Sequence, residues 1–231
     1  MSRLASLLLA VLSTTAMAAE PIVYEGFAYP SGRCEGNAGG LGWGGPWTDG
    51  HNGVQDASLV SAIGETPAAT GGHFVSTNPD WAAKRALGTP IGTEAGTWYF
   101  SLLARNDTGV REENYGRVAF FGDQGDALSL EKGYHSSTWA IGGAKNLEGR
   151  VSAITTDAVF VVIKATWKAD GTGSVAAFFD PELDTEPRVG DIGATDIAMK
   201  PISGVTIVGK KTFSFDEIRI GTSWAAVCPS P

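Results

Sequence analysis

The sequence predicts a single all-β domain, a sandwich of two antiparallel sheets. Short apolar runs recur along the chain, and turn residues among the 31 glycines and 11 prolines separate them. No stretch of 12 residues carries an apolar stripe of helical period between proper caps. A chain of 231 residues is typical of one large sandwich, and the sequence shows neither a repeat nor a linker.

The first 18 residues predict a secretory signal peptide. Arg3 precedes an apolar run, and Ala16-Met17-Ala18 gives a small-x-small cleavage site. The run is too short to span a bilayer. We therefore expect residues 19–231 to form the domain and to be secreted or periplasmic, without a membrane span.

The net charge of −8 makes nucleic acid and anionic membranes poor partners. The sequence contains no cluster of basic residues and no glycine-rich phosphate loop. Nucleotide binding is therefore not expected.

Period-2 runs predict the strands. In the clearest run, residues 97–105, Trp98, Phe100 and Leu102 alternate with more polar positions. Residues 158–163 are continuously apolar, which predicts a strand buried on both faces, and Asp170-Gly171 predicts a hairpin turn. The other predicted strands are 21–25, 58–62, 72–76, 82–87, 116–121, 127–131, 137–141, 174–179, 205–208 and the closing segment 212–224.

The closing segment changes its apolar phase at Asp216-Glu217. Phe213 and Phe215 share one face of an extended strand, whereas Ile218 and Ile220 have the opposite parity. Such a change indicates a bulge or a strand that passes between two buried layers. The two acidic residues are then either exposed at an edge of the sandwich, which we favour, or hold a cation.

Two aromatic residues lie in the glycine-rich segment 39–47. Trp43 and Trp47 could form a platform for sugar rings, but packing over the sheet edge is the favoured interpretation.

The chain contains two cysteines, Cys34 and Cys228. An even count in an exported protein favours a disulfide, and a sandwich with adjacent first and last strands would bring the two together. We therefore predict a bridge between them.

Several segments in order resemble exported bacterial proteins with a concanavalin A-like, LamG-type jelly roll. They are 24–30, 39–47, 85–88, 97–105, 178–181 and 215–224. The resemblance implies a jelly roll of two antiparallel sheets; many such modules have no known function, whereas others bind or cleave glycans. The cysteine pair departs from the general pattern.

The resemblance also implies a structural calcium ion between the chain ends. The matching positions are Glu25 in the first strand and Asp216 in the last. Calcium takes six to eight oxygen ligands, and a bulged strand frees backbone carbonyls for it.

An enzyme motif is suggested by Glu182, Asp184 and Glu186, whose spacing is similar to the E-x-D-x-E signature of retaining glucanases on this fold. Pro181 and Pro187 flank the segment, and proline is rare in central strands. We therefore favour a solvated acidic loop and predict no catalytic residue.

The candidate carbohydrate-binding residues are Tyr134, His135 and Trp139, which combine stacking surface with hydrogen-bonding groups. In the alternative, which the sequence favours, Trp139 belongs to the core and Tyr134 caps a turn.

These observations predict an exported non-catalytic lectin-like module that binds glycans or cell-envelope material. A glycoside hydrolase or polysaccharide lyase on the same fold is one alternative. A structural or adhesive protein with protein partners is the other.

Overall fold

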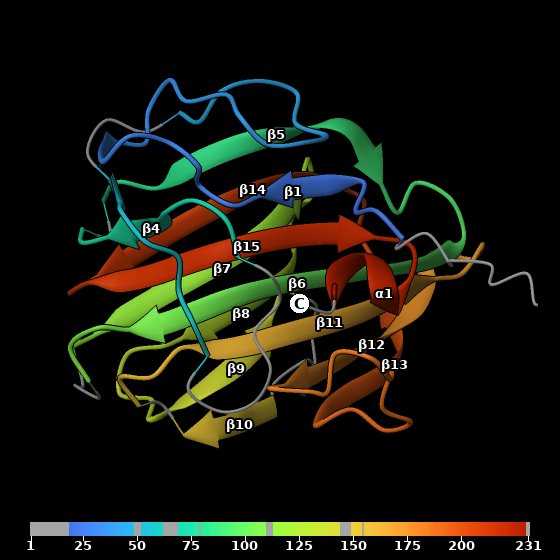
Figure 1. The fold of residues 1–231 in the computed structure, drawn as a ribbon. Helices are drawn as coiled ribbons and strands as arrows, with labels where there is room; N and C mark the ends of the chain where they lie inside the picture. Colours follow the sequence, from blue (N-terminus) through green and yellow to red (C-terminus); the bar gives the residue numbers. More distant parts are fainter. Residues whose placement is uncertain are drawn as a thin grey trace, which may run out of the picture.

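The computed structural model describes residues 19–48, 52–61, 69–78, 80–109, 113–143, 149–153 and 155–229. These residues form two antiparallel sheets that pack face to face (Figure 1). The predicted signal peptide lies outside them. The predicted all-β, concanavalin A-like jelly-roll sandwich is confirmed.

The larger sheet has nine strands, with β1 (Val23–Glu25) paired to its central strand β15. Its remaining order is β13 (Ile192–Ala198), β12 (Thr172–Phe179), β11 (Val159–Trp167), β6 (Gly96–Asn106), β15 (Phe213–Gly221), β4 (His73–Ser76), β3 (Gly53–Gln55) and β2 (Gly32–Arg33). The second sheet has six strands in the order β10 (Gly149–Ala153), β9 (Thr138–Gly142), β8 (Gly125–Lys132), β7 (Tyr115–Gly122), β14 (Ile202–Lys210) and β5 (Ala83–Ile91).

Most predicted strands form, but in the predicted segment 58–62 the described residues, 58–61, form no strand. In that segment Ser61 makes only an isolated bridge to Ala158. Four strands were not predicted: β2, β3, β10 and β13. The strands β2 and β3 have only two and three residues. The strand β13 is interrupted at Asp196, where φ is 55°. Tertiary pairing, rather than local pattern, stabilises such short strands.

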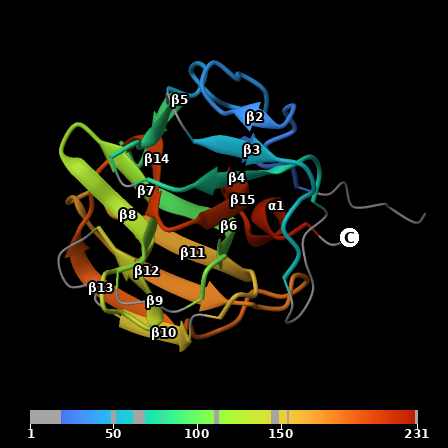
Figure 2. The same ribbon diagram turned by 90° about the vertical axis from the view of Figure 1, so that its left-hand side faces the viewer.

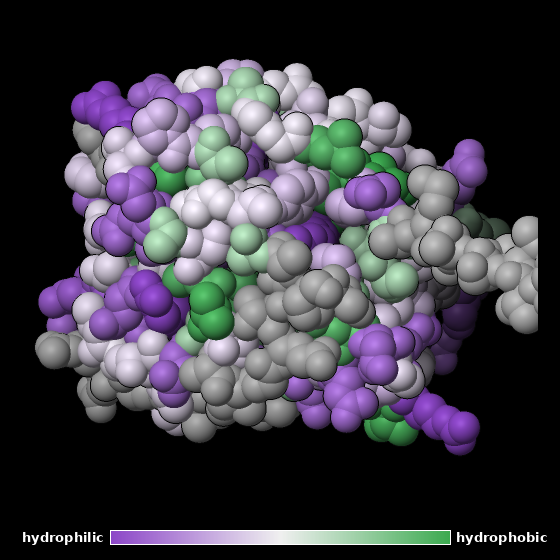
Figure 3. Space-filling model, in the orientation of Figure 1, coloured by the Kyte–Doolittle hydropathy of each residue, from purple (hydrophilic) through white to green (hydrophobic). Residues whose placement is uncertain are grey.

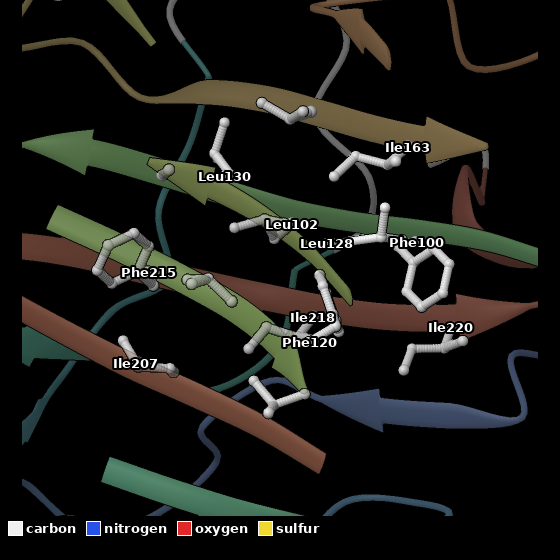
Figure 4. Close-up of a cluster of buried hydrophobic side chains, with 14 of the residues drawn as sticks. Phe100, Leu102, Phe120, Leu128, Leu130, Ile163, Ile207, Phe215, Ile218 and Ile220 are labelled. Carbon is white, nitrogen blue, oxygen red and sulfur yellow. The ribbon is translucent and has the colours of Figure 1, made fainter. Parts of the chain in front are cut away.

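The main hydrophobic core lies between the sheets. Phe100 and Leu102 of β6 meet Phe120 of β7 and Leu128 and Leu130 of β8, and the Phe100 and Phe120 ring centroids are 4.8 Å apart (Figure 4). Period-2 alternation delivers these side chains to one face of each strand.

A second cluster covers part of the outer face of the nine-stranded sheet. There Phe160 and Val162 of β11 pack near Trp224, which lies in the short helix α1 (Trp224–Val227). The Trp224 Nε1 donates to the Leu183 carbonyl at 2.9 Å. Figure 2 shows α1 against β15 and β6 on the side opposite β7 and β8. The prediction that β11 is buried on both faces is therefore confirmed.

The predicted bulge lies in the middle of β15. Its register against β6 shifts between Asp216 and Arg219, and Glu217 has a φ of 53°. Before the bulge β15 pairs with β4, and after it the same edge pairs with β1. The bulge therefore marks the point where one neighbouring strand replaces another.

The expectation that Asp216 and Glu217 are exposed is wrong, since both are fully buried. Asp216 accepts hydrogen bonds from the Leu59 and Glu217 backbone N–H groups at 2.9 and 2.8 Å. Glu217 accepts from the Thr70 N–H and the Tyr24 hydroxyl, each at 3.0 Å, and forms an ion pair with Arg219. Loop segments that contain Leu59 and Thr70 thus lie over the bulge and exclude water.

Burial, with the negative charge of Glu217 beside it, raises the pKa of Asp216 to about 8. An unfolded aspartate loses its proton near pH 4, so ionisation of Asp216 removes stability as the pH rises from about 4 to about 8. We expect the free energy of unfolding to fall over this range, and Asp216→Asn to make the fall less steep. Urea unfolding at several pH values measures both slopes, with the exposed Asp184→Asn as a matched control. Equal slopes in the wild type and Asp216→Asn would contradict the expectation.

Glu25 of β1 and Arg85 of β5 form a buried ion pair, and Arg85 also holds the glycine-rich segment 39–47 against the sandwich. Both side chains are 1% exposed. The guanidinium donates to the Gly45 and Gly39 carbonyls at 2.8 and 2.7 Å. It also lies 4.7 Å from the Trp43 ring centroid.

The second tryptophan of this segment is fully buried. Trp47 stacks on Phe27 with a centroid distance of 5.7 Å, and its Nε1 donates to Glu25 at 2.9 Å. Trp43 is half-buried, and its Nε1 donates to the Tyr24 carbonyl at 2.9 Å. Packing, rather than a sugar platform, is therefore the role of this tryptophan pair.

Replacing Arg85 by Met should lower the free energy of unfolding by about 3–5 kcal/mol, because Glu25 would stay buried without its counter-charge. Lys84→Met is the matched control, since Lys84 precedes Arg85 on β5 but is exposed. Chemical unfolding of both variants measures the difference. Equal losses in the two variants would show that the buried pair is not what stabilises this region.

The structure does not contain the predicted disulfide between Cys34 and Cys228. Cys34 is buried in the core between the sheets, whereas Cys228 is buried in the second cluster beside α1. The two cysteines belong to different hydrophobic layers, so adjacent first and last strands do not bring the sulfur atoms together.

Candidate functional site

The outer face of the six-stranded sheet carries a cluster of polar and aromatic side chains. Residues of β7 alternate, so Val118 and Phe120 enter the core while Tyr115 and Arg117 point outward. Across the sheet, Arg117 lies opposite Glu131 of β8, and Tyr115 lies opposite Lys210 of β14. Strand pairing thus collects side chains from three separate segments of the sequence.

Arg117 lies between two carboxylates. Its Nη2 is 2.6 Å from Asp126 Oδ2, and its Nε is 3.1 Å from Glu131 Oε2. The Ser129 hydroxyl also donates to Glu131, at 3.4 Å. All three charged side chains are partly exposed, so they form an oriented set of donors and acceptors at the surface.

An aromatic pair adjoins this ionic cluster. The Tyr115 and Tyr134 rings stack with centroids 5.4 Å apart and planes 17° apart. Tyr134 is 49% exposed, and Lys210 Nζ lies 5.6 Å from its ring centroid. Burial raises the pKa of Tyr115 above its usual range, so its hydroxyl stays protonated at neutral pH.

We call this set the tyrosine–arginine face; its members are Tyr115, Arg117, Asp126, Glu131, Tyr134 and Lys210. An exposed ring can stack on the apolar C–H face of a sugar, while the neighbouring charged groups can bond to hydroxyls. The face therefore offers a glycan both stacking and hydrogen-bonding contacts.

The predicted carbohydrate residues divide between surface and core. Tyr134 and His135 are exposed in the turn before β9, and His135 has a φ of 58°. Trp139 is 2% exposed and packs edge-on against Phe213 with centroids 6.1 Å apart, so it cannot contact a ligand without unfolding. The assignment of Trp139 to the site is therefore corrected to a core role.

Sequence reasoning missed five members of this face: Tyr115, Arg117, Asp126, Glu131 and Lys210. The alternation of β7 does predict that Tyr115 and Arg117 share a face. The alternation does not predict strand register, however, and it is the register that places Glu131 of β8 and Lys210 of β14 beside them.

The acidic motif at Glu182, Asp184 and Glu186 lies outside any strand, between β12 and β13. Glu182 and Asp184 are exposed, whereas Glu186 pairs with Lys164 Nζ at 2.6 Å and accepts from the Tyr99 hydroxyl at 2.9 Å. The three carboxylates therefore lack the single strand face on which the glucanase motif depends.

The predicted calcium ligands Glu25 and Asp216 do not form a common site. One oxygen of Glu25 accepts from the Phe27 N–H, and the other accepts from Tyr29, Trp47 and Arg85. Both oxygens of Asp216 accept backbone N–H groups. Among the described residues no group of three or more His, Cys, Asp or Glu could hold a metal ion. The cation beside Glu25 is Arg85, so the residues present do not fit the ion.

No protein-family model matches the sequence, and the search of curated proteins finds no match either. Among solved structures, an endo-β-1,4-glucuronan lyase from the fungus Trichoderma reesei has a TM-score of 0.49 and 14% identity over 79% of this chain and 97% of that chain. The metal-free carbohydrate recognition domain of Emp46p has a TM-score of 0.43 and 12% identity over 77% and 88%.

The receptor binding domain of botulinum neurotoxin D is a third similar structure, with a TM-score of 0.46 and 9% identity over 74% of this chain and 44% of that chain. At such identities and TM-scores the three likenesses carry no argument about activity. The described part of the chain contains no helix that could serve as a membrane span.

Removing calcium should leave the protein's thermal stability unchanged, because protein donors already occupy the oxygens of Glu25 and Asp216. Differential scanning calorimetry with an excess of chelator, and then with excess calcium, measures this. A melting temperature that falls in chelator and recovers with calcium would contradict the expectation.

Proposed function

We propose that the protein is an exported, non-catalytic, lectin-like module that binds glycans or cell-envelope material through the tyrosine–arginine face. The observation that carries the proposal is the exposed Tyr134 ring, stacked on Tyr115 and adjacent to Lys210. Because the second ring holds it in place, the exposed part of the Tyr134 ring can contact a ligand at little cost in conformational entropy.

The ionic cluster supports the same function. Asp126 and Glu131 hold the Arg117 guanidinium in position, so its remaining donors and the carboxylate acceptors are oriented before a ligand arrives. Preorganised groups lose less conformational entropy on binding. Sugar hydroxyls both donate and accept, which suits a surface that offers both.

The leading alternative is a polysaccharide lyase, because Tyr115 and Arg117 could serve as a proton-transfer group and as a partner for a substrate carboxylate. Two observations favour binding instead. The raised pKa of Tyr115 opposes its ionisation to a base at neutral pH. Two carboxylates already balance the charge of Arg117, which leaves less attraction for a third.

Replacing Tyr134 by Ala should weaken glycan binding about tenfold, since a lost aromatic contact of roughly 1.4 kcal/mol corresponds to that factor. Affinity electrophoresis against laminarin, xylan, alginate, hydroxyethyl cellulose and carboxymethyl cellulose measures the change. Trp81→Ala is the matched control, because Trp81 is an exposed aromatic residue outside this face.

Equal retardation of Tyr134→Ala and the wild type would place glycan binding elsewhere. Loss of polymer length in the same gels, abolished by Arg117→Met, would favour the lyase alternative. Binding to none of these polymers would favour the structural or adhesive alternative with protein partners.

A further inference from the structure

A row of four hydroxyl side chains crosses the outer face of the nine-stranded sheet, opposite the tyrosine–arginine face. Thr97 of β6 lies opposite Thr166 of β11, which lies opposite Ser174 of β12, which in turn lies opposite Thr195 of β13. Neighbouring strands are about 4.8 Å apart, so the row repeats at that interval and extends over about 14 Å. We call it the hydroxyl row.

A hollow of about 350 Å³ lies over three members of this row. Its floor is formed in part by Ala176 and Gly193, which lie opposite each other on β12 and β13. These small residues leave room above the sheet. Other lining residues are Lys164, Thr166, Ser174, Val175, Ala194 and Thr195.

Each lysine beside the hollow is paired with a carboxylate. Lys164 Nζ lies 2.6 Å from Glu186, and Lys168 Nζ lies 2.6 Å from Asp196. The hollow is therefore flanked by two ion pairs, and Asp170, which also interacts with Lys168, adds a further negative charge at the hairpin turn. In Figure 3, hydrophilic residues gather at the lower right, where Figure 1 shows β12 and β13.

The hydroxyl row also has unused hydrogen-bonding capacity. The Thr97 and Thr166 hydroxyls bond to each other at 2.9 Å. In the part of the chain that the structure describes, the Ser174 and Thr195 hydroxyls bond to no protein group. Each of them can donate to a ligand and accept from it.

We propose that the hydroxyl row is a second glycan-binding surface, which takes an extended and uncharged polysaccharide chain. Repeated hydroxyls match a polymer whose own hydroxyls recur along its length. Both lysines beside the hollow are paired with carboxylates, so the surface offers no net attraction to an acidic chain and suits a neutral one. This surface is on the sheet opposite the tyrosine–arginine face, so either site can fail without the other.

The test uses Tyr134→Ala as the starting protein, because that change weakens binding at the other face. Affinity electrophoresis compares hydroxyethyl cellulose, which is neutral, with carboxymethyl cellulose, which has the same backbone and negative charge. We expect the neutral polymer to retard this protein more strongly. Adding Thr166→Val, Ser174→Ala and Thr195→Val should then reduce the affinity at least fivefold.

A second variant fills the hollow and keeps every hydroxyl. A Cβ on Gly193 would meet only the Val175 carbonyl oxygen, at an ordinary 3.5 Å, so Gly193→Gln should fold and should also reduce binding at least fivefold. Gly45→Gln is the matched control, since a Cβ there has no neighbour within 4 Å and the position lies in the glycine-rich segment. Thermal melting confirms that each variant is folded.

Three results would overturn the proposal. They are no retardation by hydroxyethyl cellulose, equal or stronger retardation by carboxymethyl cellulose, and unchanged affinity in both the hydroxyl-deleted variant and folded Gly193→Gln. The first of these results would mean that Tyr134→Ala removes all glycan binding, which would support the tyrosine–arginine face as the single site.

Discussion

The bulge at Asp216–Glu217 is the constraint on which the larger sheet depends. Ahead of it Phe213 and Phe215 enter the core, and beyond it Ile218 and Ile220 do so, although the parity has changed. One extra residue in β15 therefore keeps both halves of the strand facing the second sheet. At the same position, β1 replaces β4 as the neighbour along one edge of β15. Without the bulge, the half of β15 that pairs with β1 would turn its apolar side chains away from the core.

The bulge also decides how the outer surface of that sheet is covered. It turns Asp216 and Glu217 outward, and their carboxylates accept backbone N–H groups of Leu59 and Thr70. Buried carboxylates are tolerated only when hydrogen bonds satisfy them, so the loop segments and the acidic pair require each other. Together with α1, they cover this part of the sheet and leave the hydroxyl row, which runs from β6 to β13, uncovered.

Arginine side chains neutralise buried carboxylates in this structure, a role that the resemblance assigned to a calcium ion. Arg85 balances Glu25 between the glycine-rich segment and the core, and Arg219 balances Glu217 at the bulge. A guanidinium offers several donors in a fixed plane and stacks on aromatic rings such as Trp43. It can therefore neutralise a buried carboxylate and fasten a loop at the same time. The open face of the other sheet shows the same chemistry with Arg117, where partial exposure leaves donors for a ligand.

The sequence by itself determined the sandwich, most of its strands and the bulge, because period-2 alternation and its interruption are local properties that hydrophobic burial enforces. The sequence also favoured a packing role for Trp43, Trp47 and Trp139, which the structure shows. Only the tertiary structure decided which partners each polar side chain has. Arg85 reaches Glu25 across 60 positions, Glu131 and Lys210 meet β7 through strand register, and Cys34 and Cys228 separate into different layers. Such contacts depend on how distant strands pair, and the local side-chain pattern does not record that pairing.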